Sequence, residues 1–492
     1  MIYLLITILA ILFFGLTWKN QLLGLQITLF ALPTYLIRSK LLAPFTILEL
    51  MILINFIVWF SKNISLIHLG LKNRLNKTGV AVEYPFGIEM VLVAMVGMFG
   101  VAMAGFSSNA LGIWKAYFFE PILLIIVIYQ IFGRLEINFE EKFKKLATPL
   151  IYSAILIAVI AIYQKMTGNL IYNTLWQAGS TRRVVSVFGY PNAVGLYLET
   201  IIMYAFALGL ITLGVTQNKL IDEQKITSKK FDAPKFLFYL VALTMSLLSI
   251  AFTKSNGALL GLIGGFSIFS LLYSRQTRLI WMGTLLICTS LFFATGFQKE
   301  KITEYLTLQD FSGQVRKIGW DDSWKMLKDG RIFTGAGLSN FQNTVAPYHV
   351  PGFYFNRDHD ANFLGKLLIF NDAYRAKYWQ PLEVYMYPHN IVLNFWSELG
   401  LFGLLVFTWL IGKFYYLAVK YLHAAKGHTR LIIITTISAM TTIIVHGLVD
   451  VPFFKNDLAI IFWLPIVILG LYQLEYKTAN LKIAKKSLKL AK

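Results

Sequence analysis

Cysteine is nearly absent from this chain, and charged side chains are scarce. The one cysteine, Cys288, lies within an apolar run, so the sequence excludes a disulfide framework and a thiolate metal cluster. Charged residues make up 14% of the 492 residues, hydrophobic residues make up 57%, and the mean hydropathy is +0.62. A soluble core does not need so much apolar sequence, so this composition predicts a protein with many membrane-spanning helices.

Features of several other protein classes are also missing. No internal repeat is strong enough to suggest the duplicated halves of a transporter. The apolar N-terminus has no basic segment and no small-residue cleavage site, so we interpret it as a retained span rather than a signal peptide. The net charge of +20 is concentrated in linkers between apolar runs, which favours membrane topology over nucleic-acid binding.

Long uncharged runs predict an all-α polytopic membrane protein with about 12–13 spans. The candidate spans are residues 2–17, 21–37, 41–60, 87–106, 111–132, 147–165, 191–215, 236–253, 257–274, 279–297, 389–418, 430–449 and 456–474. The basic segments all fall on one side if the C-terminus is cytoplasmic, as the positive-inside rule requires. These segments are 61–86, 133–146, 216–235, 275–278 and 476–492. Arg38 and Lys40 break the pattern, which leaves the N-terminal topology open by one span.

One segment, residues 298–388, is too long for a simple connector. It holds 11 Lys and Arg against 10 Asp and Glu, and this near-neutral balance within a basic chain is typical of the extracytoplasmic face. The helical spacing of Trp320 and Trp324 predicts a helix over 314–329, and 360–379 could hold another. We therefore expect a membrane bundle at 1–297, a mostly helical cap at 298–388, further membrane helices at 389–475 and a basic cytoplasmic tail at 476–492.

The stretch from Pro381 to Gly403 joins this cap to the next membrane helix. It places His389 in the first helical turn, where the helix dipole favours a neutral imidazole that can accept a proton. Glu398 lies about 13 Å further along the helix axis, in an apolar setting where a carboxylate needs a partner. An interfacial histidine and a glutamate turned into the bundle would explain the same pattern without catalysis.

Counting spans brings polar residues from other segments to the same membrane face. Arg182, Arg183 and Asn192 precede or open one span, and Arg316 lies near the start of the helix predicted in the cap. Guanidinium groups form paired hydrogen bonds with phosphate oxygens, so these arginines suit a lipid-linked phosphate, although pairing with lipid headgroups is an equal alternative.

His446 and Asp450 are four residues apart at the end of a later span, which on a helix would place them within hydrogen-bond reach. This pair could orient an imidazole or simply satisfy two buried polar groups.

Two further motifs lie in the cap. The amides of the glycine-rich turn 334–337 could approach an anion, or the turn could simply end the preceding helix. Asp358 and Asp360 form a D-x-D pattern, which many nucleotide-sugar enzymes use to hold a divalent cation. Nucleotide sugars are cytosolic whereas this segment should not be, so we predict no metal site.

The segment PHNIVLNFWSELGLFGLL resembles the His-Asn…Glu-x-Gly-Leu-x-Gly signature of the O-antigen ligase and O-antigen polymerase family. The resemblance extends to RVVSVFGYPNAVGLYL, VRKIGWDDSWKMLKDGRIFTGAGLSNF and HGLVDVP, and covers roughly residues 180–475. It implies an inverting, metal-independent glycosyltransferase of the GT-C type in the inner (cytoplasmic) membrane, with no cofactor. Its partners would be the bilayer, a glycan donor linked to undecaprenyl diphosphate and a glycan, lipid or protein acceptor on the extracytoplasmic face.

The resemblance also implies roles for the residues above. Arg183 and Arg316 would stabilise the departing diphosphate, and His389 would orient or deprotonate the acceptor hydroxyl. Arg183, three residues before Ser186, is preferred over its neighbour as the functional arginine. Supporting or substrate-binding positions are Arg182, Asn192, Asn390, Glu398, His446 and Asp450. A ligase and a polymerase both fit this pattern, and a polysaccharide or lipid transporter is the alternative from another class.

Overall fold

The computed structural model describes residues 2–40, 44–75, 84–179, 181–214, 232–295, 303–305, 307–369 and 372–490. Within these residues, nine helical segments are long and apolar enough to cross a membrane. They lie in α3 (Ile47–Leu75), the continuous run of α5 (Ser108–Ile113), η2 (Trp114–Phe119) and α6 (Glu120–Arg134), α7 (Phe139–Thr167), α9 (Pro191–Thr212), α10 (Ala233–Thr253), α11 (Asn256–Tyr273), α18 (Ile391–Ala424), α19 (Gly427–Gly447) and α20 (Asn456–Leu490). This architecture confirms the predicted all-α polytopic membrane class.

The N-terminal region departs from the predicted pattern of spans. Three shorter apolar helices lie here: α1 (Ile2–Lys19), α2 (Gln21–Phe30) and α4 (Gly87–Met103). The span predicted at 21–37 is interrupted, because α2 has only ten residues. Such a helix is about 15 Å long, roughly half the thickness of the hydrocarbon core.

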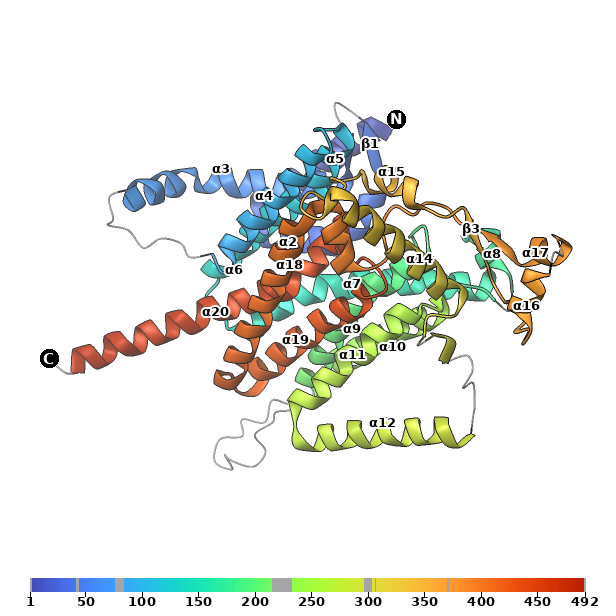
Figure 1. Cartoon of the computed structure of the whole chain (residues 1–492). Helices are drawn as coiled ribbons and strands as arrows, with labels where there is room; N and C mark the ends of the chain where they lie inside the picture. The colour runs from blue at the N-terminus through green and yellow to red at the C-terminus, as the bar shows by residue number, and fades with distance from the viewer. Residues whose placement is uncertain are drawn as a thin grey trace.

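A short hairpin follows α2 where the next predicted span should begin. The 3₁₀ helix η1 (Leu32–Leu36) leads into β1 (Arg38–Lys40), which pairs antiparallel with β2 (Pro44–Thr46). The span predicted at 41–60 therefore starts only at Ile47, with α3. In Figure 1, β1 lies toward the end that carries the cap, opposite the C-terminus, so its two basic residues remain an exception to the charge pattern.

The other predicted spans correspond to helices with shifted ends. One of them, α12 (Arg275–Thr295), packs on α11 at the edge of the bundle and is not among the nine segments (Figure 1). Most of the basic segment predicted at 216–235, and part of 61–86, lie outside the described residues.

Helices α9, α11 and α19 pack together at the centre of the bundle. Helix α11 turns glycines toward its neighbours: a Cβ atom at Gly257 would lie 2.6 Å from the His446 ring, and one at Gly261 would lie 2.7 Å from the Glu199 carboxylate. Small residues allow membrane helices to approach closely. They leave room here for two polar side chains, Glu199 of α9 and His446 of α19.

The cap lies at the end of the molecule opposite the C-terminus (Figure 1). Its elements are α14 (Phe311–Met326), η3 (Leu327–Arg331), α15 (Phe341–Val345), η4 (Ala346–Tyr348), β3 (Gly352–Tyr354), α16 (Phe363–Leu368), α17 (Asp372–Tyr378) and β4 (Trp379–Pro381). The helix predicted at 314–329 is α14 with η3, whereas the region 360–379 holds two short helices. Strands β3 and β4 pair antiparallel and close the segment between them.

The cap has a small core of its own that rests on α18. Met326, Leu327, Ala336, Phe341 and Val345 form this core, and Leu393 and Trp396 of α18 pack against it. The α14 face predicted from the tryptophan spacing contributes as well, because Trp324 meets Trp396 at 5.4 Å between ring centroids. The cap is thus held on the first turns of α18, directly above the residues that start this helix.

Candidate active site

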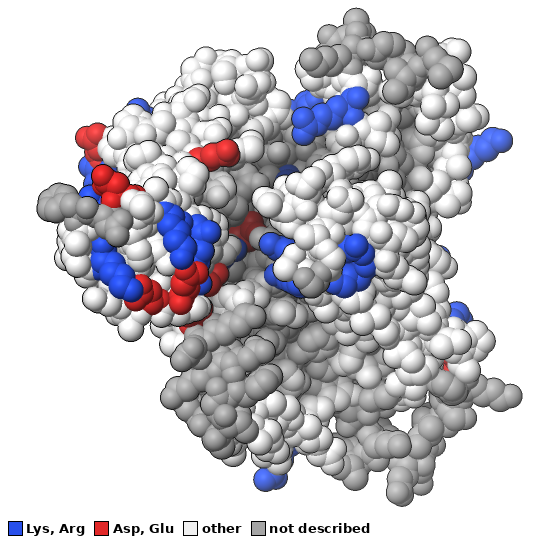
Figure 2. All heavy atoms as spheres, turned by 90° about the vertical axis from the view of Figure 1, so that its right-hand side faces the viewer, with Lys and Arg blue, Asp and Glu red and all other residues white. Residues whose placement is uncertain are grey.

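A small cleft lies between the cap and the chain that enters α18. Helix α14 contributes Arg316 and Asp322 to its lining, and the chain before α18 contributes Tyr385, Tyr387 and His389. Figure 2 views the cap end of the molecule, where basic side chains lie on both sides of a hollow beside the cap. Two of the predicted site residues, Arg316 and His389, therefore line one cleft.

The sequence predicted His389 in the first turn of α18, but the residue lies just before this helix. The helix begins at Ile391, with Asn390 as its N-cap, whose side-chain oxygen accepts a hydrogen bond of 2.9 Å from the Leu393 amide. The amide nitrogen of the Asn390 side chain donates to the Leu448 carbonyl at 3.0 Å and so ties α18 to the end of α19. His389 has a backbone φ of +48°, an uncommon conformation that turns its side chain out of the helix direction.

Aromatic rings hold the His389 imidazole from two sides. Tyr385 and Tyr387 meet it edge-on, with ring centroids 5.3 and 5.5 Å away. Its Nδ1 atom lies 3.6 Å from Oδ1 of Asp450, and the side chain is 26% exposed. The two tyrosine rings therefore position the imidazole, whereas Nδ1 faces Asp450 beyond hydrogen-bond distance and has no hydrogen-bond partner among the described residues.

Asp450 links three parts of the chain at this point. Besides facing His389, its carboxylate accepts hydrogen bonds from the Asn192 side chain at 3.1 Å and from the Val451 amide at 2.8 Å. Burial alone would raise the pKa of Asp450, but His389, His446 and the Val451 amide outweigh burial and hold this pKa well below its usual range. Asp450 is thus a buried carboxylate that stays ionised beside His389.

Arg183 and Arg316 approach this centre from two other segments. The Nε atom of Arg183 donates to the Thr253 carbonyl at 2.7 Å, and its Nη2 atom donates to the Asn192 side-chain oxygen at 3.3 Å. The Nε atom of Arg316 donates to the Val449 carbonyl at 2.8 Å. Burial and the neighbouring Arg316 charge both lower the pKa of Arg183. Within the described residues no carboxylate forms an ion pair with either arginine, so the two guanidinium groups present uncompensated positive charge.

Arg182 has a different environment from its neighbour. Its guanidinium donates to the carbonyl of Lys165 at 2.8 Å and to that of Gln177 at 3.2 Å. These bonds close the loop between α7 and α9. The geometry therefore agrees with the preference for Arg183 as the arginine that faces the site.

Glu398 connects α18 to the cap. Its carboxylate accepts a 2.8 Å hydrogen bond from the Ser339 amide, and the residue is 5% exposed. The amides of Gly335, Ala336 and Leu338 also bind protein carbonyls, at 2.8, 2.7 and 2.9 Å. Glu398 thus binds the amide of Ser339, two residues after the glycine-rich turn, and the Gly335 and Ala336 amides of the turn itself are occupied by protein carbonyls.

His446 has a partner other than the one predicted. Its Nδ1 atom lies 2.9 Å from Oε2 of Glu199, deep in the bundle, and both side chains are buried. The expected hydrogen bond with Asp450 is wrong, because α19 ends at Gly447 and the i, i+4 geometry of a helix does not continue to Asp450. His446 instead supports the packing of α9 and α19 beneath the site.

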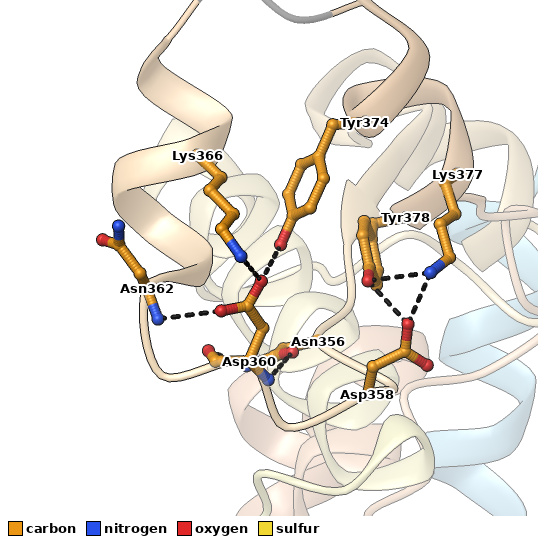
Figure 3. Close-up of polar contacts among 8 residues, drawn as sticks. All are labelled: Asn356, Asp358, Asp360, Asn362, Lys366, Tyr374, Lys377 and Tyr378. Carbon is orange, nitrogen blue, oxygen red and sulfur yellow. Dashed lines mark hydrogen bonds and ion pairs between the residues drawn. The ribbon is translucent and has the colours of Figure 1, made fainter.

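Asp358 and Asp360 lie in the cap and point to separate partners (Figure 3). The Asp358 carboxylate pairs with Lys377 at 2.7 Å, and the Asp360 carboxylate pairs with Lys366 at 2.6 Å. Each carboxylate also accepts a hydrogen bond from a tyrosine hydroxyl, that of Tyr378 or Tyr374. Among the described residues, no group of three His, Cys, Asp or Glu side chains is arranged to hold a metal ion.

Sequence reasoning missed several polar residues around the cleft. Asp322 and His349 form a buried pair, with Nδ1 of His349 2.9 Å from the carboxylate and Nε2 3.2 Å from the Leu382 carbonyl. Burial raises the pKa of Asp322, although His349 opposes this shift. Spacing could not reveal the pair, because 27 residues separate its members along the chain.

A comparison with known families matches part of this chain. Residues 240–408 match the family model described as O-antigen ligase, which confirms the resemblance predicted from the sequence. The matched region runs from α10 through the cap to the middle of α18, and so includes Arg316, His389 and Glu398. Comparisons with curated proteins and with solved structures give no significant match.

Proposed function

We propose, on the premise that residues 240–408 form an O-antigen ligase domain, that this protein is a membrane glycosyltransferase. It moves a glycan from undecaprenyl diphosphate to an acceptor hydroxyl, with inversion at the anomeric carbon and without a metal ion. The observation that carries the proposal is that His389 and its neighbour Asp450 lie close to Arg183 and Arg316, which form no ion pair within the described residues.

The residues support each part of this reaction. His389 accepts the proton of the acceptor hydroxyl while the hydroxyl oxygen bonds to the anomeric carbon. The bond from that carbon to the phosphate oxygen breaks, and the diphosphate leaves with both electrons of the bond. Arg183 and Arg316 stabilise the charge that develops on the diphosphate, and Asp450 stabilises the imidazolium that forms.

The cap side of the membrane is the extracytoplasmic face in this proposal. The lysine-rich C-terminal segment lies at the opposite end of the molecule (Figure 1), as the positive-inside rule requires of a cytoplasmic tail. The near-neutral composition of the cap segment supports the same orientation, and the donor would reach the cleft from the outer leaflet of the inner membrane.

The test is glycan transfer by the purified protein in detergent, with a lipid-linked donor. Replacing His389 by Gln removes the proton acceptor, and we expect transfer to fall about 10²- to 10⁴-fold. Arg183→Lys is expected to reduce transfer about 10²-fold or more, because lysine cannot reproduce the paired contacts of the guanidinium group. The matched control is Arg182→Lys, whose side chain binds loop carbonyls and should leave transfer within a few-fold of wild type. A folded His389→Gln protein with wild-type transfer would remove His389 from the proposed role.

Deletion of the gene in its own host separates the two acceptor classes. A ligase would leave long glycan chains on the undecaprenyl carrier, whereas a polymerase would leave single repeat units. Unchanged surface glycans, in a host with no second copy of the gene, would contradict both activities.

A further inference from the structure

Lys455 approaches the site from a direction that the two arginines do not cover. It directly precedes α20, and its backbone is fixed by hydrogen bonds to the Phe453 carbonyl at 2.8 Å and from the Ala459 amide at 2.8 Å. The side chain lies over the Tyr190 ring, with Nζ 4.1 Å from the ring centroid. This cation–π contact holds the ammonium group at the start of α9.

No acceptor for the Lys455 ammonium group is found among the residues that the structure describes. Within the described residues it forms no hydrogen bond or ion pair, although the side chain is half-buried. An ammonium group has three N–H donors, and leaving them unpaired away from bulk water is costly. The group therefore suits a ligand that brings its own acceptor oxygens.

The charged and hydroxyl groups around Lys455 come from every adjoining element. Asp457 lies on α20 itself, Asp450 between α19 and α20, Tyr190 before α9, and Tyr387 on the chain entering α18. Burial lowers the pKa of Lys455, while Asp457 and Asp450 act in the opposite direction. Both carboxylates already accept backbone amide hydrogens, from Leu458 and Val451.

The two tyrosines connect Lys455 to His389. The hydroxyl group of Tyr190 interacts with that of Tyr387, and the Tyr387 ring lies 5.5 Å from the His389 ring. Lys455 is thus joined to the proposed proton acceptor by a continuous chain of side-chain contacts. Arg183 and Arg316 reach the same centre through Asn192 and Val449.

We propose that Lys455 binds a phosphate oxygen of the diphosphate-linked donor, as a third cation beside Arg183 and Arg316. This inference rests on the proposed function. A diphosphate ester carries two negatively charged phosphate groups, and it gains further charge when the glycan leaves. A third cation on a separate element allows both phosphate groups to be held during this step.

The experiment compares wild type with Lys455→Met, Lys455→Arg and the control Lys420→Met, in nonionic detergent and in vesicles containing anionic lipid. Lys420 is an exposed lysine on α18, outside the proposed machinery. Two quantities are measured: the KM for the lipid-linked donor, and the direct binding of undecaprenyl diphosphate and undecaprenyl monophosphate to folded protein. Thermal unfolding identifies the folded fraction, and Lys455→Gln replaces the Met variant if that variant does not fold.

We expect Lys455→Met to raise the KM and weaken diphosphate binding about 10- to 100-fold, because a hydrogen bond to a charged group is lost. Monophosphate binding should weaken less, and Lys455→Arg should stay within a few-fold of wild type. A Met variant within two-fold of wild type in both quantities overturns the inference. An effect that appears only in vesicles containing anionic lipid also overturns it, because Lys455 would then bind a bilayer headgroup.

The same data separate this inference from the proposed function. If wild type binds the diphosphate through Lys455 but transfers no glycan, the inference stands and the proposed function fails. If wild type transfers glycan and the Met variant is unchanged, the proposed function stands and the inference fails. If wild type binds no diphosphate, both fail.

Discussion

Gly400 gives the sharpest test of how the cap is fixed to the membrane helices. This residue interrupts the helical geometry of α18 with φ +69° and ψ −170°, a conformation almost restricted to glycine. The kink lies directly under the cap: a Cβ atom at position 400 would fall 2.0 Å from the Phe333 carbonyl oxygen. The next amide, that of Leu401, donates to the Ile332 carbonyl at 3.0 Å.

Gly400→Ala should therefore destabilise the contact between α18 and the cap in two ways. Forcing alanine into this backbone conformation costs about 1–3 kcal/mol. Relieving the overlap with Phe333 requires a backbone shift, which adds about 1–3 kcal/mol. The free energy of unfolding should fall by about 2–6 kcal/mol, and the unfolding midpoint by about 2–6 °C for a chain of this length.

The matched control is Gly412→Ala on the same helix. A Cβ atom at position 412 meets nothing within 4 Å, so the substitution should leave stability unchanged or raise it by up to about 1 kcal/mol. Thermal unfolding in detergent measures both variants, and transfer shows whether the cap has moved. If Gly400→Ala unfolds at the wild-type temperature and keeps wild-type transfer, the kink does not constrain the cap and the reasoning is refuted.

Two further outcomes concern the site and the cap. The pKa of Asp450 lies below its usual range, so its stabilising contribution is complete above its unfolded pKa of about 3.9 and is lost as the pH falls through the lower folded pKa. Asp450→Asn should lower transfer at pH 7 about 10-fold or more, because the carboxylate that stabilises the imidazolium is gone. Transfer at the wild-type rate would show that the 3.6 Å contact does not act on the ring. For the cap, we expect that neither EDTA nor the double variant Asp358→Asn, Asp360→Asn changes transfer, because both carboxylates form ion pairs with lysines. Inhibition by EDTA that added Mg²⁺ or Mn²⁺ reverses would contradict this expectation.

The motif at the start of α18 has two parts that the structure separates. His389 and Asn390 lie at the candidate site, whereas Glu398 and Gly400 lie where α18 contacts the cap. The distance along the helix shows that Glu398 lies far from His389, and the apolar setting shows that it needs a partner. That the partner is the Ser339 amide follows only from the folded cap.

Local sequence was sufficient for properties that depend on near neighbours. Apolar run length predicts membrane helices because the bilayer thickness sets the length of a span, and the tryptophan spacing predicts α14 because helical periodicity is local. The same reasoning failed where a helix is shorter than predicted, as with α2 and at the end of α19. The residue at which a helix ends depends on the side chains and backbone that pack against that end.

Residue types and family motifs were enough to nominate Arg183, Arg316, His389 and Asp450. Their arrangement came from contacts between segments far apart in the chain: Asn192 binds Asp450 across 258 residues, and Arg316 binds Val449 across 133. Contacts between distant segments also explain why His446 pairs with Glu199 rather than with the predicted Asp450, and why Lys455 lies over the Tyr190 ring. Hydrogen bonds act over about 3 Å, so which polar groups pair is decided by how the helices pack, and periodicity along one helix does not contain that information.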